Sequence, residues 1–227
     1  MSQSNRFAVI GLGRFGERLA RQLAAAGAEV IAVDSRQELV EEIRDSVTVA
    51  VCLDATDEQA LRAQGIDKVD VAVVGIGAAF EEAALATSTL KRIGVPRVIS
   101  RATTRARAEI LSRIGADDVV IPEAESADRW CQRLVMPNVM EKIELGDQHS
   151  VVQIRAPDSW AGKTLEQLNI RKKWKVNVVA IRRLLPDESK GRGGYVIATP
   201  MPDSRIELGD LLLVVGSDEA IEALPTQ

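Results

Sequence analysis

Short apolar runs alternate with amphipathic segments through the first half of the chain, and this alternation constrains the fold more than any other feature. The runs are continuously apolar, as in strands buried on both faces of a sheet. They cover residues 7–13, 29–35, 48–54, 70–77, 96–102 and 117–123. Helical segments are predicted between them at 16–27, 37–46, 57–66, 81–94 and 106–116. This order predicts an α/β fold, a Rossmann-like doubly wound parallel sheet with helices on both faces.

The pattern changes in the second half of the chain. Residues 126–145 are predicted to form one longer helix, disturbed near Pro137. Strands then follow one another with little helix between them, which predicts a small α+β domain. The strands are expected at 151–157, 177–183, 194–200 and 210–216, the short helices at 164–170 and 218–225, and a flexible loop at 186–194. The predicted organisation is a nucleotide-binding domain at 1–125, a crossover helix at 126–145 and a C-terminal domain at 146–227.

The composition of the chain limits the kinds of molecule that it is expected to bind. The formal net charge is −4 and only 3% of the residues are aromatic, which argues against a nucleic-acid-binding surface. No stretch approaches the length of a membrane span. Cys52 and Cys131 are the only cysteines and lack metal-ligand spacing, as expected in a reducing cytosol. Action at a membrane would therefore require a membrane-embedded partner.

Three glycines follow the first apolar run, in the stretch FAVIGLGRFG at 7–16. Their G-x-G-x-x-G spacing is typical of a phosphate-binding turn between a strand and a helix. Gly11 permits the turn, Gly13 admits the phosphates close to the backbone, and Gly16 lets the helix pack on the strand. Arg14 and Phe15 lie inside the same loop. The arginine is unexpected, since the backbone N–H groups of the loop already favour an anion.

Polar groups and glycines at the other strand ends should meet at the same edge of the sheet. Asp34 ends the second run and is expected to bind free ribose hydroxyls, with Ser35 beside it. The further candidates, each at the end of a later run, are Asp54, Ala55, Gly75, Gly77, Arg101 and Glu123. Two alternatives stay open: Asp54 caps the next helix, or Arg101 and Glu123 form a solvated ion pair.

Groups for catalysis are missing from these strand ends. The only histidine, His149, and the only tyrosine, Tyr195, lie beyond the predicted nucleotide domain. A nicotinamide dehydrogenase needs such a group, or a metal, to relay a proton. The site is therefore predicted to bind a nucleotide without transforming it, and no catalytic residue is assigned.

Six segments together resemble the cytosolic RCK (KTN plus TrkA-C) regulatory subunits of bacterial Trk and Ktr potassium uptake systems. They are FAVIGLGRFG at 7–16, VIAVD at 30–34, DATDE at 54–58, VVGIG at 73–77, IGADDVVIPE at 114–123 and IELGDLLLVVG at 206–216. The length resembles that of the short Ktr-type subunit, which has one such unit. Leu53 departs from the family, in which many members have glycine before Asp-Ala-Thr.

The resemblance implies particular roles at the site. Arg14 is expected to reach the γ-phosphate of ATP on the neighbouring subunit of a dimer and to lose that contact with ADP. Glu123 is expected to hold a divalent cation, Mg²⁺ or Ca²⁺, beside the phosphates, and Arg101 to lie near them. A charge-assisted contact to one more phosphate, worth roughly 1.5–3 kcal/mol, is enough to bias two states of a ring.

The resemblance also implies partners and a location. A homodimer would assemble into an octameric ring on the cytoplasmic face of the plasma membrane, docked on a membrane subunit that conducts K⁺. ATP would activate and ADP inactivate. The C-terminal domain is expected to dimerise, and cyclic di-AMP is a further ligand in some relatives, with Arg171 and the basic run at 171–174 as its candidates or as a plain exposed helix end. The alternative function is an NAD(H)-binding redox sensor or an NAD-dependent oxidoreductase.

Overall fold

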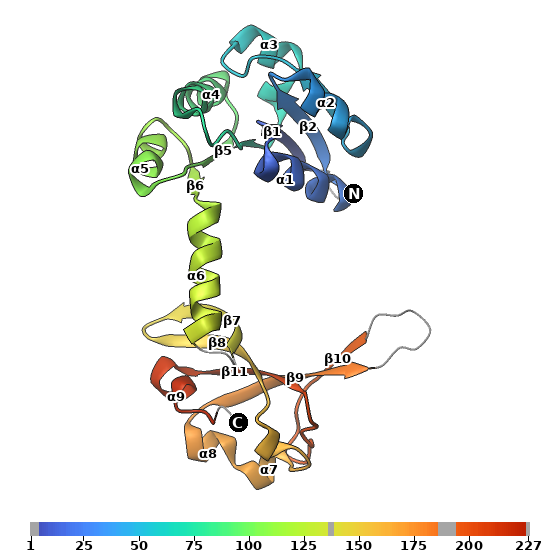
Figure 1. The fold of residues 1–227 in the computed structure, drawn as a ribbon, viewed down its shortest axis with the longest axis vertical. Coiled ribbons are helices and arrows are strands. Elements are labelled where there is room, and N and C mark those ends of the chain that lie inside the picture. Colours follow the sequence, from blue (N-terminus) through green and yellow to red (C-terminus); the bar gives the residue numbers. More distant parts are fainter. Residues whose placement is uncertain (1–4, 136–138, 186–193, 226–227) are drawn as a thin grey trace. The chain divides into compact units, whose positions relative to one another are not determined.

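The computed structural model describes residues 5–135, 139–185 and 194–225. The chain divides into two compact units, Met1–Glu125 and Ser126–Gln227, each with its own sheet (Figure 1).

Six parallel strands form the sheet of the first unit, in the order β3-β2-β1-β4-β5-β6. The strands are β1 (Arg6–Ile10), β2 (Glu29–Asp34), β3 (Val49–Cys52), β4 (Val71–Val74), β5 (Arg97–Arg101) and β6 (Asp118–Val120). The helices are α1 (Arg14–Ala25), α2 (Gln37–Ile43), α3 (Glu58–Ala63), α4 (Phe80–Ile93) and α5 (Arg105–Arg113), with 3-10 turns η1 (Arg44–Ser46) and η2 (Ile66–Lys68). The strand order reverses beside β1, as in a doubly wound sheet, so the predicted fold class is confirmed.

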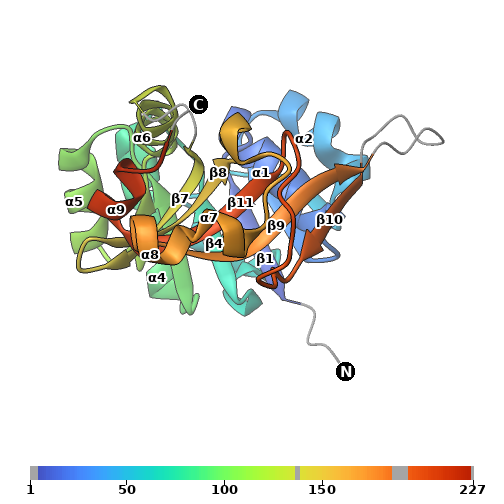
Figure 2. The ribbon, with the colours of Figure 1, turned by 90° about the horizontal axis from the view of Figure 1, so that it is seen from below.

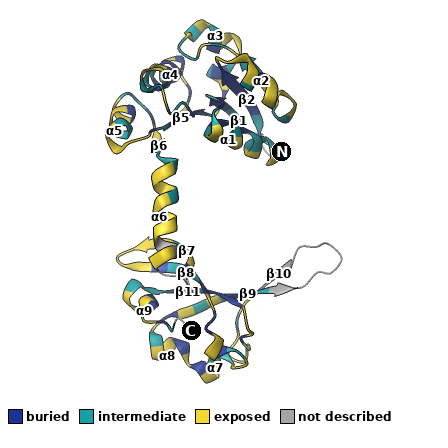
Figure 3. Ribbon diagram, in the orientation of Figure 1, coloured by how far each residue is buried: buried dark blue, intermediate teal, exposed yellow. Residues whose placement is uncertain are grey.

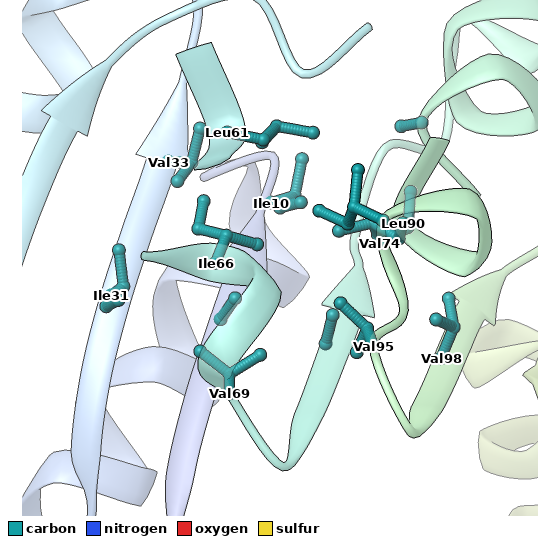
Figure 4. Packing of buried hydrophobic residues seen from close by; sticks show 14 of the residues in the cluster. Ile10, Ile31, Val33, Leu61, Ile66, Val69, Val74, Leu90, Val95 and Val98 are labelled. Carbon is teal, nitrogen blue, oxygen red and sulfur yellow. The ribbon is translucent and has the colours of Figure 1, made fainter. Parts of the chain in front are cut away.

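Successive residues of β1 pack on opposite faces of this sheet. Ile10 belongs to a buried cluster with Leu61 of α3 and Leu90 of α4 (Figure 4). Its neighbour Val9 belongs to a second cluster that includes Ala20 of α1. A strand covered on both faces must be apolar at every position, which is why the runs lack in-out alternation.

The second unit contains a five-stranded antiparallel sheet in the order β10-β9-β11-β8-β7. The strands are β7 (Val139–Gly146), β8 (His149–Arg155), β9 (Asn177–Leu185), β10 (Gly194–Ala198) and β11 (Leu211–Ser217). The short helices are η3 (Asp158–Trp160), α7 (Leu165–Leu168), α8 (Ile170–Trp174) and α9 (Asp218–Glu222). Figure 2 looks onto the face of this sheet that carries α7 and α8. Apart from Gly194, the predicted loop at 186–194 lies outside the described residues.

The predicted helix at 126–145 is wrong in its extent. Helix α6 runs from Pro122 to Val135, and Val139–Gly146 is strand β7. Proline suits the first turn of a helix, because the N–H it lacks has no intrahelical partner there. Strand β7 pairs with β8 through a turn in which Asp147 and Gln148 have φ of 49° and 59°. Two register shifts interrupt β7, which obscures the two-residue period that identifies a strand. The predicted disturbance at Pro137 lies outside the described residues.

Helix α6 is exposed along most of its length in the single chain, whereas strands β1 and β2 are largely buried (Figure 3). Apolar side chains contribute to that exposure, with Leu134 at 73% and Val135 at 71%. On β7, Ile143 is 62% and Leu145 is 59% exposed.

Candidate functional site

A pocket of about 490 Å³ lies at the carboxyl ends of strands β1 to β5. Such a pocket, at the point where the strand order reverses, is the usual ligand site of a doubly wound sheet. Nine of its lining residues are sequence candidates: Gly11, Gly13, Asp34, Ser35, Asp54, Ala55, Gly75, Gly77 and Arg101. Four other candidates, Arg14, Phe15, Gly16 and Glu123, are not part of the lining.

The first and third glycines of the loop are required by close packing. A Cβ on Gly16 would lie 1.9 Å from the carbonyl oxygen of Gly11, and a Cβ on Gly75 would lie 3.0 Å from the same oxygen. Gly11 has φ of +89° and donates its N–H to Val33 at 2.7 Å. These contacts hold α1 directly against β1 and β4, so Gly11 and Gly16 form the turn itself.

Gly13 differs from the other two. No atom lies within 4 Å of where its Cβ would be, and its φ of −66° suits any residue. Packing therefore does not require glycine here, although glycine is a suitable N-cap for α1. Gly13 also lines the pocket, so a ligand in the pocket would lie close to it.

Asp34 is only 7% exposed and fastens the glycine loop to the end of β2. Its Oδ2 accepts a hydrogen bond of 2.7 Å from the backbone N–H of Leu12. Its Oδ1 accepts from the backbone N–H of Arg36 at 2.9 Å and faces the Arg36 Nε at 3.4 Å. A carboxylate has about four acceptor positions, so Asp34 retains capacity for a hydroxyl group. The ribose role stays a prediction.

Asp54 does not cap the helix that follows it. The cap of α3 is Asp57, which accepts from Gln59 at 2.9 Å and from Ala60 at 3.1 Å. Asp54 instead accepts from the backbone N–H and the hydroxyl of Thr56, both at 2.8 Å. These bonds, the backbone one first, hold the pKa of Asp54 below its ordinary value. The capping alternative is therefore wrong, and an ionised carboxylate lies on the pocket wall.

Arg101 ends β5 and forms another wall of the pocket. A Cβ on Gly77 would lie 2.6 Å from its Nη1, so glycine is needed for the guanidinium to lie there. Its Cζ is 5.8 Å from the centre of the Phe15 ring. The guanidinium also donates to the carboxylate of Glu123. The two residues therefore form an ion pair, but Arg101 is only 18% exposed rather than solvated, and its role toward phosphates stays a prediction.

Glu123 lies in the first turn of α6, with its side chain 63% exposed. Its pKa is held below the ordinary value, first by a hydrogen bond to its own backbone N–H and then by Arg101 and Arg14. Arg14 is exposed at the start of α1. Among the described residues, no group of three or more His, Cys, Asp or Glu side chains could hold a metal ion. The metal-binding role of Glu123 stays a prediction.

Several pocket residues were missed by the sequence interpretation. Most of them lie just after a predicted strand, while Ile76 lies near the end of one and Glu82 in the first turn of the helix that follows: Arg36, Thr56, Ile76, Ala78, Ala79 and Glu82. Position near the end of a strand was their only signal, because the glycine motif does not extend to them. His149, the first residue of β8, and Tyr195 of β10 belong to the second unit, as expected. Within the described residues, no helix is both long and apolar enough to cross a membrane.

The fold and pocket define a class of protein with two domains. The first is a Rossmann-like domain of the nucleotide-binding type, and the second is a separate antiparallel-sheet domain. The sequence matches the TrkA-N domain family over residues 7–122 and the TrkA-C domain family over residues 150–224. The chain belongs to this family of TrkA-N and TrkA-C proteins.

Two curated relatives match nearly end to end. The Ktr system potassium uptake protein C of Bacillus subtilis is 38% identical, over 93% of this chain and 91% of that protein. The Ktr system potassium uptake protein A of the same organism is 32% identical, over 97% of this chain and 95% of that protein.

Solved structures show the same fold. The GsuK RCK domain has a TM-score of 0.65 at 15% identity, over 98% of this chain. The GsuK channel bound to NAD has a TM-score of 0.55 at 25% identity, over 97% of this chain. This chain spans 47% and 38% of those two chains.

Proposed function

We propose that this protein is a non-catalytic, nucleotide-sensing regulatory subunit of a potassium uptake system. The observation that carries the proposal is the pocket at the carboxyl ends of β1 to β5, with the unfilled space at Gly13 beside it. The full-length similarity to two Ktr potassium uptake proteins supplies the transport context. The subunit would act on a membrane-embedded K⁺-conducting partner from the cytoplasmic face of the plasma membrane.

The proposed ligands are ATP, which activates, and ADP, which inactivates. The glycine loop would hold the first two phosphates through backbone N–H groups. Arg14 is exposed and lies outside its own pocket, which supports a contact with the third phosphate of a nucleotide on a neighbouring subunit. Only ATP carries that phosphate, so only ATP would join the two subunits there.

A divalent cation, Mg²⁺ or Ca²⁺, is proposed to lie beside the ATP phosphates, with Glu123 as its ligand from this chain. Carboxylate and phosphate oxygens suit these hard cations. Because Arg101 already pairs with Glu123, the cation would compete with an arginine for the carboxylate.

Assembly is proposed to proceed through homodimers to an octameric ring. The exposed apolar side chains on α6 and β7, Leu134, Val135, Ile143 and Leu145, support self-association. Arg171, Lys172 and Lys173 of α8 are exposed and remain the candidates for cyclic di-AMP.

Two measurements test the proposal. Calorimetry with ATP, ADP, NAD⁺ and NADH, with and without Mg²⁺, should give micromolar or tighter binding of ATP and ADP. Expression together with a Ktr-type membrane subunit, in a strain deficient in K⁺ uptake, should restore growth at low K⁺. Failure of both would reject the function.

An NAD(H) sensor is the second candidate, favoured by the similarity to the GsuK channel bound to NAD. A clear preference for NADH, without discrimination between ATP and ADP, would establish it in place of the first. Hydride transfer to a small carbonyl substrate would establish an oxidoreductase instead.

A further inference from the structure

The guanidinium of Arg101 is only partly satisfied. Its side chain is 18% exposed, and one nitrogen donates to Glu123. Its Nε is buried without a hydrogen-bond partner among the described residues. A guanidinium carries five N–H donors, and a buried donor left unpaired has a free-energy cost. Arg101 can therefore donate further hydrogen bonds to a bound anion.

The unused donors belong to a residue that lines the pocket. Gly77 leaves room for the guanidinium on one side, and Phe15 lies 5.8 Å from its Cζ. These contacts fix the position of the guanidinium without neutralising it. A phosphate oxygen in the pocket would complete its hydrogen bonding and pairs well with its planar geometry.

Glu123 is the group that partly neutralises Arg101 in this state. Its carboxylate lies outside the pocket lining and is largely exposed. Solvent reaches the pair from the side of Glu123, which is 63% exposed, although Arg101 is only 18% exposed, so the pair is worth on the order of 1 kcal/mol. It is weak enough for a ligand with a higher negative charge to break.

We propose that the carboxylate of Glu123 competes with the phosphates of the ligand for the guanidinium of Arg101. Phosphate binding would transfer Arg101 from Glu123 to the ligand and release the first turn of α6. The inference rests on the proposed function, because it concerns the same nucleotide pocket. It gives Glu123 a role that does not require a metal ion.

The test is to measure nucleotide affinity in EDTA. Because EDTA removes divalent cations, a role of Glu123 as a metal ligand contributes nothing to this measurement. Glu123→Gln should bind ATP and ADP about two- to fivefold more tightly than the wild type, the size expected for removing an exposed ion pair. Adenosine, which lacks phosphate, should bind equally to both proteins. Thermal unfolding of the unliganded variant should shift down slightly, by no more than a few degrees, because the ion pair that competes with the ligand also stabilises the free protein.

Two further variants test whether the effect is specific to Glu123 and depends on Arg101. Glu125→Gln removes a second exposed carboxylate from the same turn of α6 and should leave ATP affinity unchanged. Arg101→Gln should lower ATP affinity by about ten- to a hundredfold, and Glu123→Gln should then have no further effect. That non-additivity identifies Arg101 as the group for which Glu123 competes.

Equal or weaker ATP binding by Glu123→Gln in EDTA would overturn the inference while leaving the proposed function intact. An equal gain for adenosine, or an equal gain from Glu125→Gln, would overturn it as well. Absence of ATP and ADP binding by the wild type would reject the proposed function and this inference together.

Discussion

Gly13 and Gly16, the second and third glycines of the loop, have different physical roles. Gly16 is required because a Cβ there would lie 1.9 Å from a backbone oxygen, which cannot move away. Gly13 has open space where its Cβ would be and lines the pocket, so nothing within the chain excludes a side chain there. Packing explains Gly16, whereas Gly13 is favoured within the chain only as the N-cap of α1, and an approaching ligand would explain it further.

Substituting each glycine by alanine separates folding from binding. Gly16→Ala should destabilise the protein by more than about 3 kcal/mol, because α1 must move away from β1. Gly13→Ala should cost about 1 kcal/mol or less, since alanine is only a poorer N-cap there. It should weaken ADP binding at least tenfold. Urea unfolding and calorimetry check these values, and unchanged ADP affinity of Gly13→Ala would show that phosphate does not approach this residue.

At the scale of the elements, Asp117 joins α4 to β5 just before β6. Its Oδ2 accepts from the backbone N–H of Val98 at 2.7 Å and lies 2.9 Å from the Lys91 Nζ. The hydrogen bond from Lys91 first, and then that from the Val98 N–H, hold the pKa of Asp117 below its ordinary value. The folded state therefore favours the ionised carboxylate.

Because the pKa is lowered on folding, this stabilisation is present above the unfolded value and is lost as the pH falls through the folded value. Asp117→Asn should cost about 1 kcal/mol at pH 7, a modest value because Lys91 and Asp117 are partly exposed. The difference from the wild type should shrink as the pH falls below the ordinary aspartate pKa of about 3.9, because the carboxylate is then progressively protonated in both states. Urea unfolding between pH 2.5 and 7 measures it. Asp118→Asn, which removes a contact with the exposed Arg97, is the control and should change stability less.

The elements of the first unit could be predicted because burial on both faces leaves continuous apolar runs, as in residues 29–35. Strand β7 could not be predicted, because its two register shifts hide the two-residue period of a strand. In addition, its apolar residues Ile143 and Leu145 are exposed. At the site, glycines and strand-end residues identified half of the lining. Pairings such as Leu12 with Asp34 depend on how a loop folds back on a strand, and local sequence does not contain that information.

At the scale of the whole molecule, nucleotide sensing requires a difference between ATP and ADP that reaches beyond one subunit. In the proposed function, the pocket of one chain would offer backbone N–H groups and Arg101 to the phosphates, and these would serve a diphosphate as well as a triphosphate. Arg14 lies outside this lining and is exposed. Under the proposed function, Arg14 is the cation that we expect to contact the third phosphate of another subunit's nucleotide.

Arg14→Ala should therefore erase the preference for ATP over ADP and leave ADP affinity within about twofold of the wild type. The lost contact is worth roughly 1.5–3 kcal/mol, which is about a ten- to a hundredfold loss in ATP affinity. Calorimetry measures both affinities, and light scattering measures assembly with each nucleotide. Arg18→Ala, which removes another exposed arginine one turn further along α1, is the matched control and should keep the preference. If Arg14→Ala weakened ADP as much as ATP, Arg14 would be a phosphate ligand within its own subunit, and the difference between the two nucleotides would have to arise elsewhere in the assembly.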